Sequence, residues 1–374
     1  MNPIKIIHTA DLHFGAEFAF LNERQKNQRK SELWLTFTKI IDKCIKEEAD
    51  FLLIAGDVFD SNAADSALAE SFFKCIETLP KTQVIAVTGN HDPFTTDSPY
   101  LGYPLPKNFH IIGSENVKID FDDKNCSVFG SAFVGCYKEP QSLFSAPIDK
   151  SRINIAVIHG DINSGSKYNY ISREFLENSG MNYVALGHIH KYTGIQKAGS
   201  TCYAYPGCPE PHGFDELGKK GVIVGNISPE KAEFEFVPMS QRIHYCAHLD
   251  ISGAISNSDI ENSIAQSLFY EFGEEYDKNL YEIILEGETE ENFRPDVAAL
   301  CSRFNDKVFF MKIKDRTTVK TNFELLKKEK SLKGEFARIM LEKIEAEPEN
   351  EELKMVLDTG LKAFFGEVKY DEDK

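Results

Sequence analysis

Short runs of apolar residues alternate with polar loops over the first 240 residues of the chain. Five of these runs are rich in β-branched residues and lead into Gly, Asp or Asn, which is the pattern of buried central strands. We expect these strands at Ile4–His8, Phe51–Ala55, Val84–Thr88, Ile153–His159 and Tyr183–Leu186.

Two segments of the same region carry apolar residues at helical spacing, Glu23–Ala49 and Asp65–Thr78. Later apolar runs follow one another without room for crossover helices, so we expect a second, largely antiparallel sheet stacked on the first. The strands expected in this later part are Val117–Phe121, Cys126–Phe133, Thr201–Tyr205, Gly221–Gly225 and Ala232–Val237.

The pattern changes after Pro238, where three strands alternate with two helices as a compact β-α-β-α-β unit. A helical region over about 322–366 follows, and Pro348 divides it into two helices. We therefore expect three domains, at residues 1–242, 243–318 and 319–374. The expected elements of the middle unit are the strands Arg242–Ile251, Leu280–Leu285 and Val308–Ile313 and the helices Asp259–Phe272 and Asn292–Phe304.

The composition of the 374 residues is that of a globular protein, with 42% hydrophobic and 27% charged residues. The chain has 42 Lys and Arg against 59 Asp and Glu, a formal net charge of −17, which speaks against a polybasic membrane binder or a protein that coats nucleic acid through bulk charge alone. It does not exclude nucleic acid, because a local basic stripe or a metal can supply positive charge. Most of the acidity lies after residue 244, and Lys307–Lys333 is locally basic. That basic stretch is either a solvated face or a contact for phosphate or a partner.

Two features of the sequence predict a cytoplasmic location. The N-terminus lacks the pattern of a secretory signal, and the longest apolar run is far shorter than the roughly 20 residues of a membrane span. Eight scattered cysteines without a CxxC pair are typical of reduced cytosolic thiols. We therefore expect a cytoplasmic protein that does not enter a membrane.

Five short polar motifs follow the predicted strands. Each could be a turn or a helix cap when taken alone. Because each follows an apolar run that would end at the same edge of a parallel sheet, we expect them to meet at one site. The motifs are Asp11–His13, Gly56–Asp60, Gly89–Asp92, His159–Asp161 and Gly187–His190.

The side chains of these motifs suit divalent metal ions. Carboxylates, an amide oxygen and neutral imidazoles are ligands for transition metals of borderline hardness. A single carboxylate, Asp57, can bridge two cations about 3.5–4 Å apart, the separation that clamps the attacking and leaving oxygens of a phosphoryl group. The glycines before Asp57, Asn90 and His188 leave room for sharp turns and for the ions.

These motifs, in this order, resemble the calcineurin-like dinuclear metallophosphoesterase superfamily. The opening Ile6–Gly15, together with Tyr205–Pro211, Phe214–Glu216 and Lys220–Val222, is similar to the SbcD / meiotic-recombination-eleven group of DNA repair nucleases. The resemblance implies an α/β fold, a two-sheet metallophosphoesterase sandwich flanked by helices over residues 1–242. It also implies a small α/β capping, DNA-binding domain at 243–318 and a helical C-terminal region at 319–374 that docks on an ATPase.

The resemblance assigns a role to each candidate site residue. Two divalent ions, manganese by resemblance, would share the bridging Asp57. His91 would act on the phosphate as general acid or transition-state stabiliser, and Asp60 stands where archaeal and eukaryotic members often have a histidine. For His8 we favour a structural role. The implied ligands are Asp11, His13, His190 and Asp57 for one ion and Asp57, Asn90, His159 and His188 for the other.

The activity implied is that of a DNA exonuclease/endonuclease acting in double-strand break repair or hairpin processing. Its partners would be double-stranded DNA ends or hairpins and an SbcC-type coiled-coil ATPase, and a homodimer stays open. The alternatives are a phosphoesterase for a small phosphodiester or a phosphoprotein, and a scaffold without turnover.

Two sets of residues each allow a purely structural and a functional interpretation. The apolar stripe with Leu353, Leu357 and Leu361 is either ordinary core or an ATPase-docking face. The basic residues at the start of the first helix either meet the DNA backbone or are solvated. These residues are Arg24, Lys26, Arg29 and Lys30.

Overall fold

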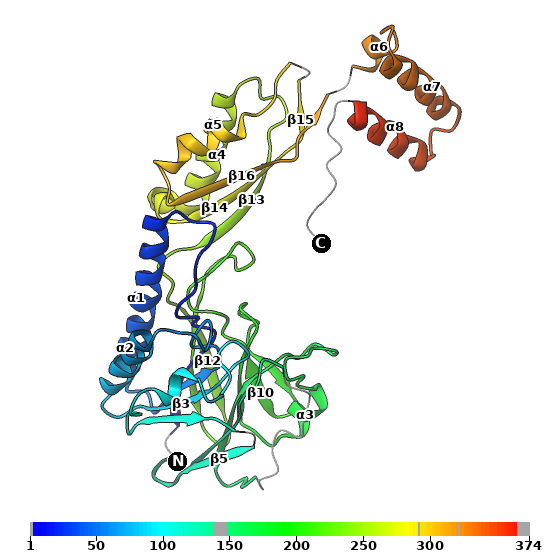
Figure 1. Ribbon diagram of the computed structural model, residues 1–374. Coiled ribbons are helices and arrows are strands. Elements are labelled where there is room, and N and C mark those ends of the chain that lie inside the picture. Colours follow the sequence, from blue (N-terminus) through cyan, green and yellow to red (C-terminus); the bar gives the residue numbers. More distant parts are fainter. Residues whose placement is uncertain (1–2, 115, 138–147, 291, 321, 365–374) are drawn as a thin grey trace. The chain divides into compact units, whose positions relative to one another are not determined.

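The first 238 residues of the protein contain two six-stranded sheets. The structure, a computed structural model, describes residues 3–114, 116–137, 148–290, 292–320 and 322–364 (Figure 1). The first sheet has the order β12-β11-β1-β2-β3-β4, and the second has the order β5-β6-β7-β8-β10-β9.

The first sheet is parallel from β1 to β4 and antiparallel from β1 to β12. Strands β1 to β4 pair in parallel, whereas β11 runs antiparallel to β1 and β12 antiparallel to β11. The register aligns His8 with Leu53, and Leu53 with Ile85, so the carboxyl ends of β1, β2 and β3 meet at one edge. The strands are β1 (Ile4–Thr9), β2 (Phe51–Ala55), β3 (Gln83–Val87), β4 (Phe109–Ile112), β11 (Gly221–Ile227) and β12 (Ala232–Pro238).

The second sheet is mainly parallel, so the prediction of a largely antiparallel second sheet was wrong. Its four central strands β6, β7, β8 and β10 pair in parallel, and only the edge strands β5 and β9 are antiparallel. The physical reason is that the long connections between β6, β7 and β8 do leave room for crossovers, and α3 (Arg173–Asn178) occupies one of them. The strands are β5 (Val117–Phe121), β6 (Cys126–Ser131), β7 (Ile153–His159), β8 (Tyr183–Gly187), β9 (Gln196–Ala198) and β10 (Thr201–Ala204).

Helices cover the outer faces of the two sheets. Apolar residues of α1 (Glu23–Glu47) and α2 (Ser66–Glu77) pack with β1, β2 and β3 in one core, and α3 packs on β7 and β8 in another. A third core lies between the sheets and includes Leu53, Ile85 and Val157. Strands buried on both faces explain the continuous apolar runs of the sequence. The two-sheet sandwich flanked by helices is therefore confirmed.

Local signals set the helix boundaries close to the predicted ones. Asn22 caps α1 through a capping box with Gln25, and Glu48 ends the helix in the left-handed conformation. Asp65 caps α2 by accepting a hydrogen bond from the backbone of Ala67. Two short 3-10 turns, Pro99–Leu101 and Asp122–Lys124, complete this part of the chain.

The remainder of the chain has the predicted β-α-β-α-β order followed by helices. A three-stranded sheet has the order β13-β14-β16. The break near Pro348 separates α7 from α8, and predicted positions 365–366 lie outside the described residues. The elements are β13 (His244–Asp250), α4 (Asn257–Phe272), a 3-10 turn (Gly273–Lys278), β14 (Leu280–Glu286), β15 (Glu288–Thr289), α5 (Val297–Asn305), β16 (Phe310–Asp315), β17 (Thr318–Val319), α6 (Phe323–Leu326), α7 (Leu332–Ala346) and α8 (Glu351–Phe364).

The chain divides into two compact units. The first contains Met1–Ala247, Phe272–Glu282 and Arg303–Lys312, and the second contains His248–Glu271, Ile283–Ser302 and Ile313–Lys374. All predicted site residues belong to the first unit, and the division into three domains stays a prediction. None of the helices described here has the length and apolar character that crossing a membrane requires.

Two buried histidines of the first unit make its stability depend on pH. Burial lowers the pKa of His8, whose Nδ1 lies 2.9 Å from the Tyr183 hydroxyl, to about 3. Burial also lowers the pKa of His244 to about 4. The unfolded chain binds protons below pH 6.5 and the folded chain does not, so stability falls as the pH drops from about 6.5 towards these values.

We expect each of these histidines to cost about 1.4 kcal/mol of stability between pH 8 and pH 5.5. Thermal unfolding in EDTA at both pH values measures the effect. His8→Gln should flatten the dependence, whereas replacement of the exposed His248 should leave it unchanged. Equal slopes for His8→Gln and the unmodified protein would contradict this explanation.

Candidate metal centre

The loops that follow β1 and β2 hold the first three predicted ligands in strained backbone conformations. Asp11, His13 and Asp57 have φ values of 53°, 46° and 51°, in the left-handed region that residues other than glycine rarely adopt, and His188 has a φ of 104°. The two loops are joined by hydrogen bonds from the Asp11 and His13 amides to the Gly56 and Asp57 carbonyl oxygens. Such strain concentrates at functional sites, where surrounding contacts maintain it.

Three glycines provide the close approach that the sequence predicted. A Cβ atom at Gly56 would lie 2.3 Å from His159 Nδ1, and one at Gly89 would lie 2.1 Å from Asp57 Oδ1. At Gly187 it would lie 1.8 Å from the carbonyl oxygen of Ala55, where the two sheets meet. Only Gly56 of the three also has a positive φ, so Gly89 and Gly187 are required for space.

We expect Gly187→Ala to destabilise the protein by about 1–3 kcal/mol, because β8 must move away from β2 to make room for the methyl group. Thermal unfolding should show the loss. Gly135→Ala is the matched control, since a Cβ at Gly135 meets nothing within 4 Å. Equal unfolding temperatures for the two variants would contradict the packing argument.

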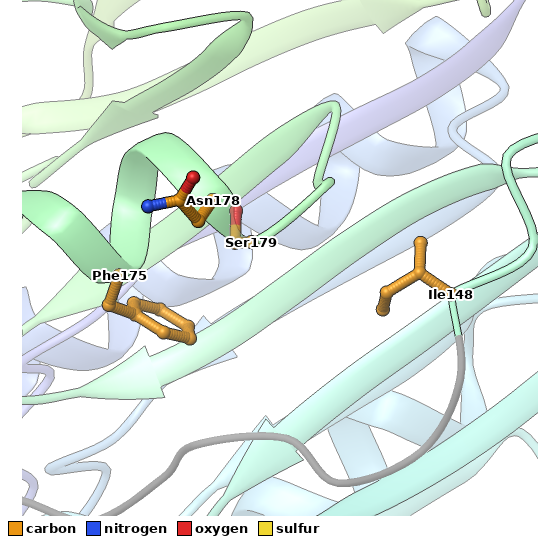
Figure 2. Close-up of a pocket in the computed structure, with 4 residues that line it drawn as sticks. All are labelled: Ile148, Phe175, Asn178 and Ser179. Carbon is orange, nitrogen blue, oxygen red and sulfur yellow. The ribbon is translucent and has the colours of Figure 1, made fainter.

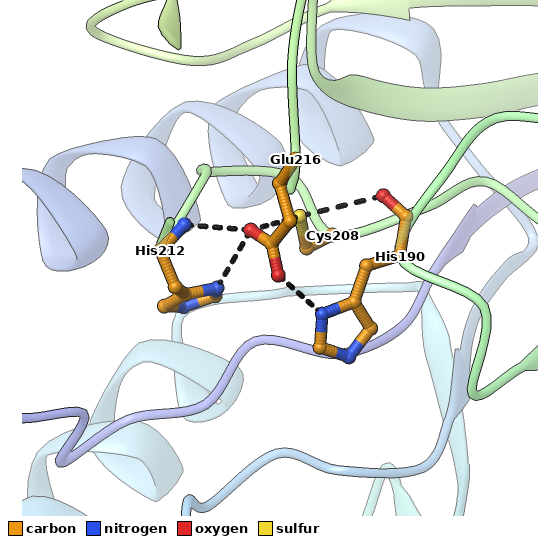
Figure 3. A group of neighbouring side chains, drawn as sticks. All are labelled: His190, Cys208, His212 and Glu216. Atoms are coloured by element: carbon orange, nitrogen blue, oxygen red, sulfur yellow. Dashed lines mark hydrogen bonds and ion pairs between the residues drawn. The ribbon is translucent and has the colours of Figure 1, made fainter. Parts of the chain in front are cut away.

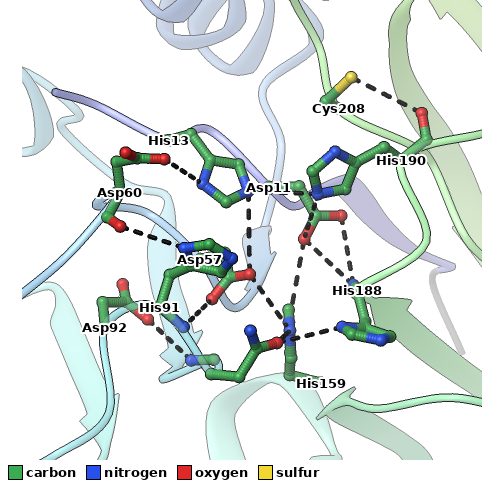
Figure 4. A network of polar contacts seen from close by, with 12 residues as sticks. Asp11, His13, Asp57, Asp60, His91, Asp92, His159, His188, His190 and Cys208 are labelled. Carbon is green, nitrogen blue, oxygen red and sulfur yellow. Dashed lines mark hydrogen bonds and ion pairs between the residues drawn. The ribbon is translucent and has the colours of Figure 1, made fainter. Parts of the chain in front are cut away.

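The first group of predicted ligands contains Asp11, His13 and His190. The Nε2 atoms of His13 and His190 face each other at 3.2 Å, and Asp11 Oδ1 lies 3.9 Å from His190 Nε2 (Figure 4). Asp11 also accepts a hydrogen bond from the backbone amide of His188 at 3.1 Å. These three side chains come from the ends of β1 and β8, which belong to different sheets.

The second group contains Asn90, His159 and His188. Asn90 Oδ1 lies 3.0 Å from His159 Nε2 and 3.1 Å from His188 Nδ1. Asp57 lies between the two groups, with Oδ2 at 3.4 Å from His159 Nε2 and 3.8 Å from His13 Nε2. The structure thus brings all seven predicted ligands together. It draws them from the ends of strands in two sheets, whereas the sequence predicted the edge of one.

The nitrogen and oxygen atoms that converge in the two groups are suited to bind cations. His13 Nδ1 donates to Asp60 and His159 Nδ1 donates to the carbonyl oxygen of Ala55 at 2.8 Å, so the Nε2 atom of each ring presents a lone pair. The lone pair of His159 faces the oxygens of Asn90 and Asp57, which are themselves acceptors. Such a cluster of lone pairs is unfavourable unless a proton or a metal ion lies among them.

The pKa shifts of the candidate ligands also suit a site for cations. Burial raises the pKa of Asp11, whereas for Asp57 the imidazoles of His159 and His13 outweigh burial and lower the pKa. Burial lowers the pKa of His188 to about 4. Burial also disfavours the charged form of His190, but the carboxylates of Glu216 and Asp11 outweigh it and raise the pKa to about 9.

His91 lies beside the ligands with its side chain exposed. Its backbone amide donates to Asp57 Oδ1 at 2.9 Å, and its Nδ1 lies 3.1 Å from the carbonyl oxygen of Asp60. The ring stands edge-on to the ring of His13, with 4.8 Å between centroids. The exposed ring can be reached from solvent.

Three buried or half-buried carboxylates support the site and were not assigned this role from the sequence. Asp92 accepts hydrogen bonds from the backbone amides of Val58, Phe59 and Gly89 and from the Tyr100 hydroxyl, and so joins the loops that carry Asp57 and Asn90. Burial beside Asp57 raises the pKa of Asp92 to about 7. Asp60 and Glu216 accept hydrogen bonds from His13 and His190. Each stands inside a motif noted in the sequence, but only the fold shows its partner.

The basic start of α1 differs from the prediction. Arg29 is fully buried and donates to Glu32, to Glu210 at 2.7 Å and to the carbonyl oxygen of Pro211 at 2.8 Å. Both interpretations of this segment, a contact with DNA and a solvated helix start, took Arg29 to be exposed, and for Arg29 that was wrong because two carboxylates neutralise it inside the protein. Lys26 forms an ion pair with Glu23.

Ion pairs also occupy part of the basic stretch Lys307–Lys333. Lys312 lies 3.4 Å from Glu282, and Lys320 lies 3.9 Å from Glu290. Lys327 lies 3.3 Å from Glu345. These pairs favour the interpretation of a solvated face for these lysines.

A separate pocket of about 210 Å³ lies beside α3 and is lined by Ile148, Phe175, Asn178 and Ser179 (Figure 2). None of these residues is a predicted ligand, and none of the described pocket-lining side chains carries a charge. We assign it no part in the chemistry of the site.

The sandwich and its cluster of carboxylate, amide and imidazole side chains are what a metal-dependent phosphoester hydrolase requires. Residues 4–192, about half of the chain, match the family model of the calcineurin-like phosphoesterases. The chain belongs to this family, which uses a dinuclear divalent metal site.

Three curated proteins show how the chain relates to members of the family. It is 29% identical over 259 residues to the uncharacterized metallophosphoesterase YhaO of Bacillus subtilis, covering 65% of this chain and 61% of that protein. It is 24% identical over 237 residues to the DNA double-strand break repair protein Mre11 of Saccharolobus solfataricus, covering 59% and 60%. It is also 24% identical over 273 residues to one subunit of the nuclease SbcCD of Staphylococcus epidermidis, covering 63% and 70%. The matched part thus spans about three fifths of the length of the first two relatives.

Proposed function

We propose that this protein is a manganese-dependent DNA nuclease, an exonuclease/endonuclease that acts on double-strand ends or hairpins in DNA repair. The observation that carries the proposal is the similarity to a double-strand break repair protein and to a component of a nuclease. Both alignments are longer than the segment that the family model matches, residues 4–192. The cytoplasmic location expected from the sequence is part of the same proposal.

In this proposal Asp11, His13, His190 and Asp57 hold one ion, and Asp57, Asn90, His159 and His188 hold the other. When bound, two such ions supply an activated water and neutralise charge on the phosphoryl oxygens. Asp57 Oδ1 accepts a hydrogen bond from the His91 amide, which fixes the carboxylate with Oδ2 between the two groups of histidines.

His91 supplies a proton at the leaving oxygen. Its exposed ring is held through Nδ1 by the carbonyl oxygen of Asp60, so Nε2 is the atom that reaches a phosphodiester. Asp92 keeps the loops of Asp57 and Asn90 together, so the proton donor and the ligands hold a fixed spacing.

A cleavage assay of the full chain tests the proposal. Linear duplex and hairpin DNA are compared with bis(p-nitrophenyl) phosphate and a phosphopeptide, each with Mn²⁺ or Mg²⁺. We expect cleavage of DNA in Mn²⁺. Hydrolysis of only the small diester or only the phosphopeptide would instead favour a small-molecule phosphodiesterase or a protein phosphatase.

The proposal includes an SbcC-type ATPase as partner, which requires a docking surface other than the apolar stripe with Leu353, Leu357 and Leu361. Leu357 and Leu361 are buried in the core that α6, α7 and α8 share, and Leu353 packs against that core. Of the two interpretations left open by the sequence, these contacts favour ordinary core for the stripe. Other apolar side chains are exposed, among them Leu332 and Met355. A groove of about 410 Å³ is lined by Phe336, Met355, Val356, Thr359 and Gly360.

We expect Met355→Glu to abolish copurification with an SbcC-type ATPase, because the new carboxylate would be desolvated in the apolar contact. Lys354→Glu introduces the same group one residue away on the exposed face of α8 and should leave association unchanged. Pull-down with the ATPase measures both variants. Equal binding of Met355→Glu and the unmodified protein would exclude this groove as the docking site.

A further inference from the structure

Two carboxylates outside the proposed ligand set hold the two histidines of the first group. Asp60 Oδ1 accepts a hydrogen bond from His13 Nδ1 at 3.0 Å, and Glu216 Oε1 accepts one from His190 Nδ1. These are the same two rings whose Nε2 atoms converge at 3.2 Å. Each carboxylate therefore keeps a proton on Nδ1 of its histidine. It also fixes the orientation of the ring, so that Nε2 points into the site.

The histidines of the second group are His159 and His188. Among the residues that the structure describes, no carboxylate is hydrogen-bonded to either ring in the way that Asp60 and Glu216 are to His13 and His190. His159 Nδ1 donates to the carbonyl oxygen of Ala55, which is neutral. The amide of Asn90 takes the place that Asp11 has in the first group, and it is also neutral. The two groups share Asp57, and the Asp161 carboxylate acts electrostatically on His188. Among the described residues, however, only the first group has a carboxylate outside the ligand set hydrogen-bonded to each of its imidazoles.

Glu216 is the centre of a buried network. Besides His190, it accepts hydrogen bonds from the His212 amide at 2.6 Å, His212 Nδ1 at 3.2 Å and the Cys208 thiol at 3.2 Å (Figure 3). The side chains of His190, Cys208, His212 and Glu216 could also be considered as ligands of a separate ion. However, each of these hydrogen bonds ends on the carboxylate itself, and one donor is a backbone amide, which binds no cation. The geometry is that of an acceptor surrounded by donors.

We propose that Asp60 and Glu216 are positioning residues that make the site of Asp11, His13 and His190 the tighter of the two ion sites. They orient the two imidazoles, and their negative charge increases the affinity of the rings for a cation. The first ion therefore occupies this site before the second site fills. The inference rests on the proposed ligand set and does not depend on whether the substrate is DNA.

Titration of the metal-free full chain with Mn²⁺, followed by calorimetry and electron paramagnetic resonance, tests the proposal. The unmodified protein should bind one equivalent tightly as an isolated ion and a second more weakly as a coupled pair. Glu216→Gln should weaken the first step by about 10–100-fold and leave the second unchanged. Asp60→Asn should act in the same direction and less strongly, because the Asp60 side chain is 40% exposed.

Glu210→Gln is the matched control. Glu210 is a buried carboxylate of the same loop, but its donors are Arg29, Thr36 and the backbone amide of Gln241, so this variant should lower thermal stability without changing the first Mn²⁺ affinity. Glu216→Gln should have no further effect in a His190→Ala background, because Glu216 acts through that ring.

Other outcomes distinguish a failure of the positioning roles of Asp60 and Glu216 from a failure of the proposed ligand set. Unchanged first-step affinity in Glu216→Gln, or an equal loss with and without His190, would overturn the inference. A third equivalent of Mn²⁺ that disappears in Cys208→Ser would make the cluster an ion site and overturn it as well. If His190→Ala itself leaves Mn²⁺ binding unchanged, the ligand set of the proposed function fails.

Discussion

Asp57→Asn is expected to lower the metal-dependent phosphodiesterase rate by about 10³-fold or more, which corresponds to about 4 kcal/mol of transition-state stabilisation. Asp57 is the carboxylate that lies between both groups of histidines, with Oδ2 within 4 Å of His159 Nε2 and His13 Nε2. Its loss should therefore affect both ions at once.

The surroundings of Asp57 determine how asparagine would sit there. The His91 amide donates a hydrogen bond to Oδ1, so the amide oxygen of asparagine must take that position. The NH₂ group then points at the lone pairs of His159 and His13 and donates to them. Asp57→Asn should thus be as stable as the unmodified protein in EDTA, or more stable, while it loses Mn²⁺.

Three measurements check this expectation: bound Mn²⁺ after dialysis, the hydrolysis rate of bis(p-nitrophenyl) phosphate and the unfolding temperature in EDTA. Asp123→Asn, which removes an exposed carboxylate remote from the predicted ligands, should change none of them. Two ions retained at full rate in Asp57→Asn would refute the role of Asp57 as the bridging ligand.

The clustering of the candidate site residues could be predicted because these residues follow strands that are buried on both faces. Such strands are recognisable as apolar runs, and the residue after each run is restricted to turn-forming and ligand types. The periodicity does not show which sheet a strand joins. Strands β7 and β8 have the same apolar pattern as β1, β2 and β3 but lie in the other sheet.

Contacts between residues far apart in the sequence explain why other features of the structure were not predicted. Strand β11 pairs with β1, with Ile227 opposite Ile4, and no local signal in either strand specifies that partner. Arg29 lies on a helix as predicted, but its burial depends on Glu210, 181 residues away in the sequence. The role of Glu216 likewise depends on a contact with His190 across 26 residues. Local propensity cannot predict such contacts, because they form only when the sandwich closes.

His91→Ala is expected to lower turnover of DNA by about 10²–10⁴-fold while both ions remain bound. The ring is exposed, and its hydrogen bond from Nδ1 to the carbonyl oxygen of Asp60 does not involve a predicted ligand side chain. The backbone amide that positions Asp57 remains in the variant. Thermal stability and Mn²⁺ content should therefore stay close to those of the unmodified protein.

The leaving group distinguishes a proton donor from a group that only stabilises charge. A nitrophenolate leaves without a proton, whereas the alkoxide of a DNA strand requires one. If His91 donates the proton, His91→Ala should lose about 10³-fold on DNA but only about tenfold on bis(p-nitrophenyl) phosphate. Equal losses on both substrates would assign His91 to charge stabilisation at the phosphoryl group, and a loss of Mn²⁺ would make it a ligand. His248→Ala, on an exposed strand position of the second unit, is the control for removal of an imidazole and should retain both rates.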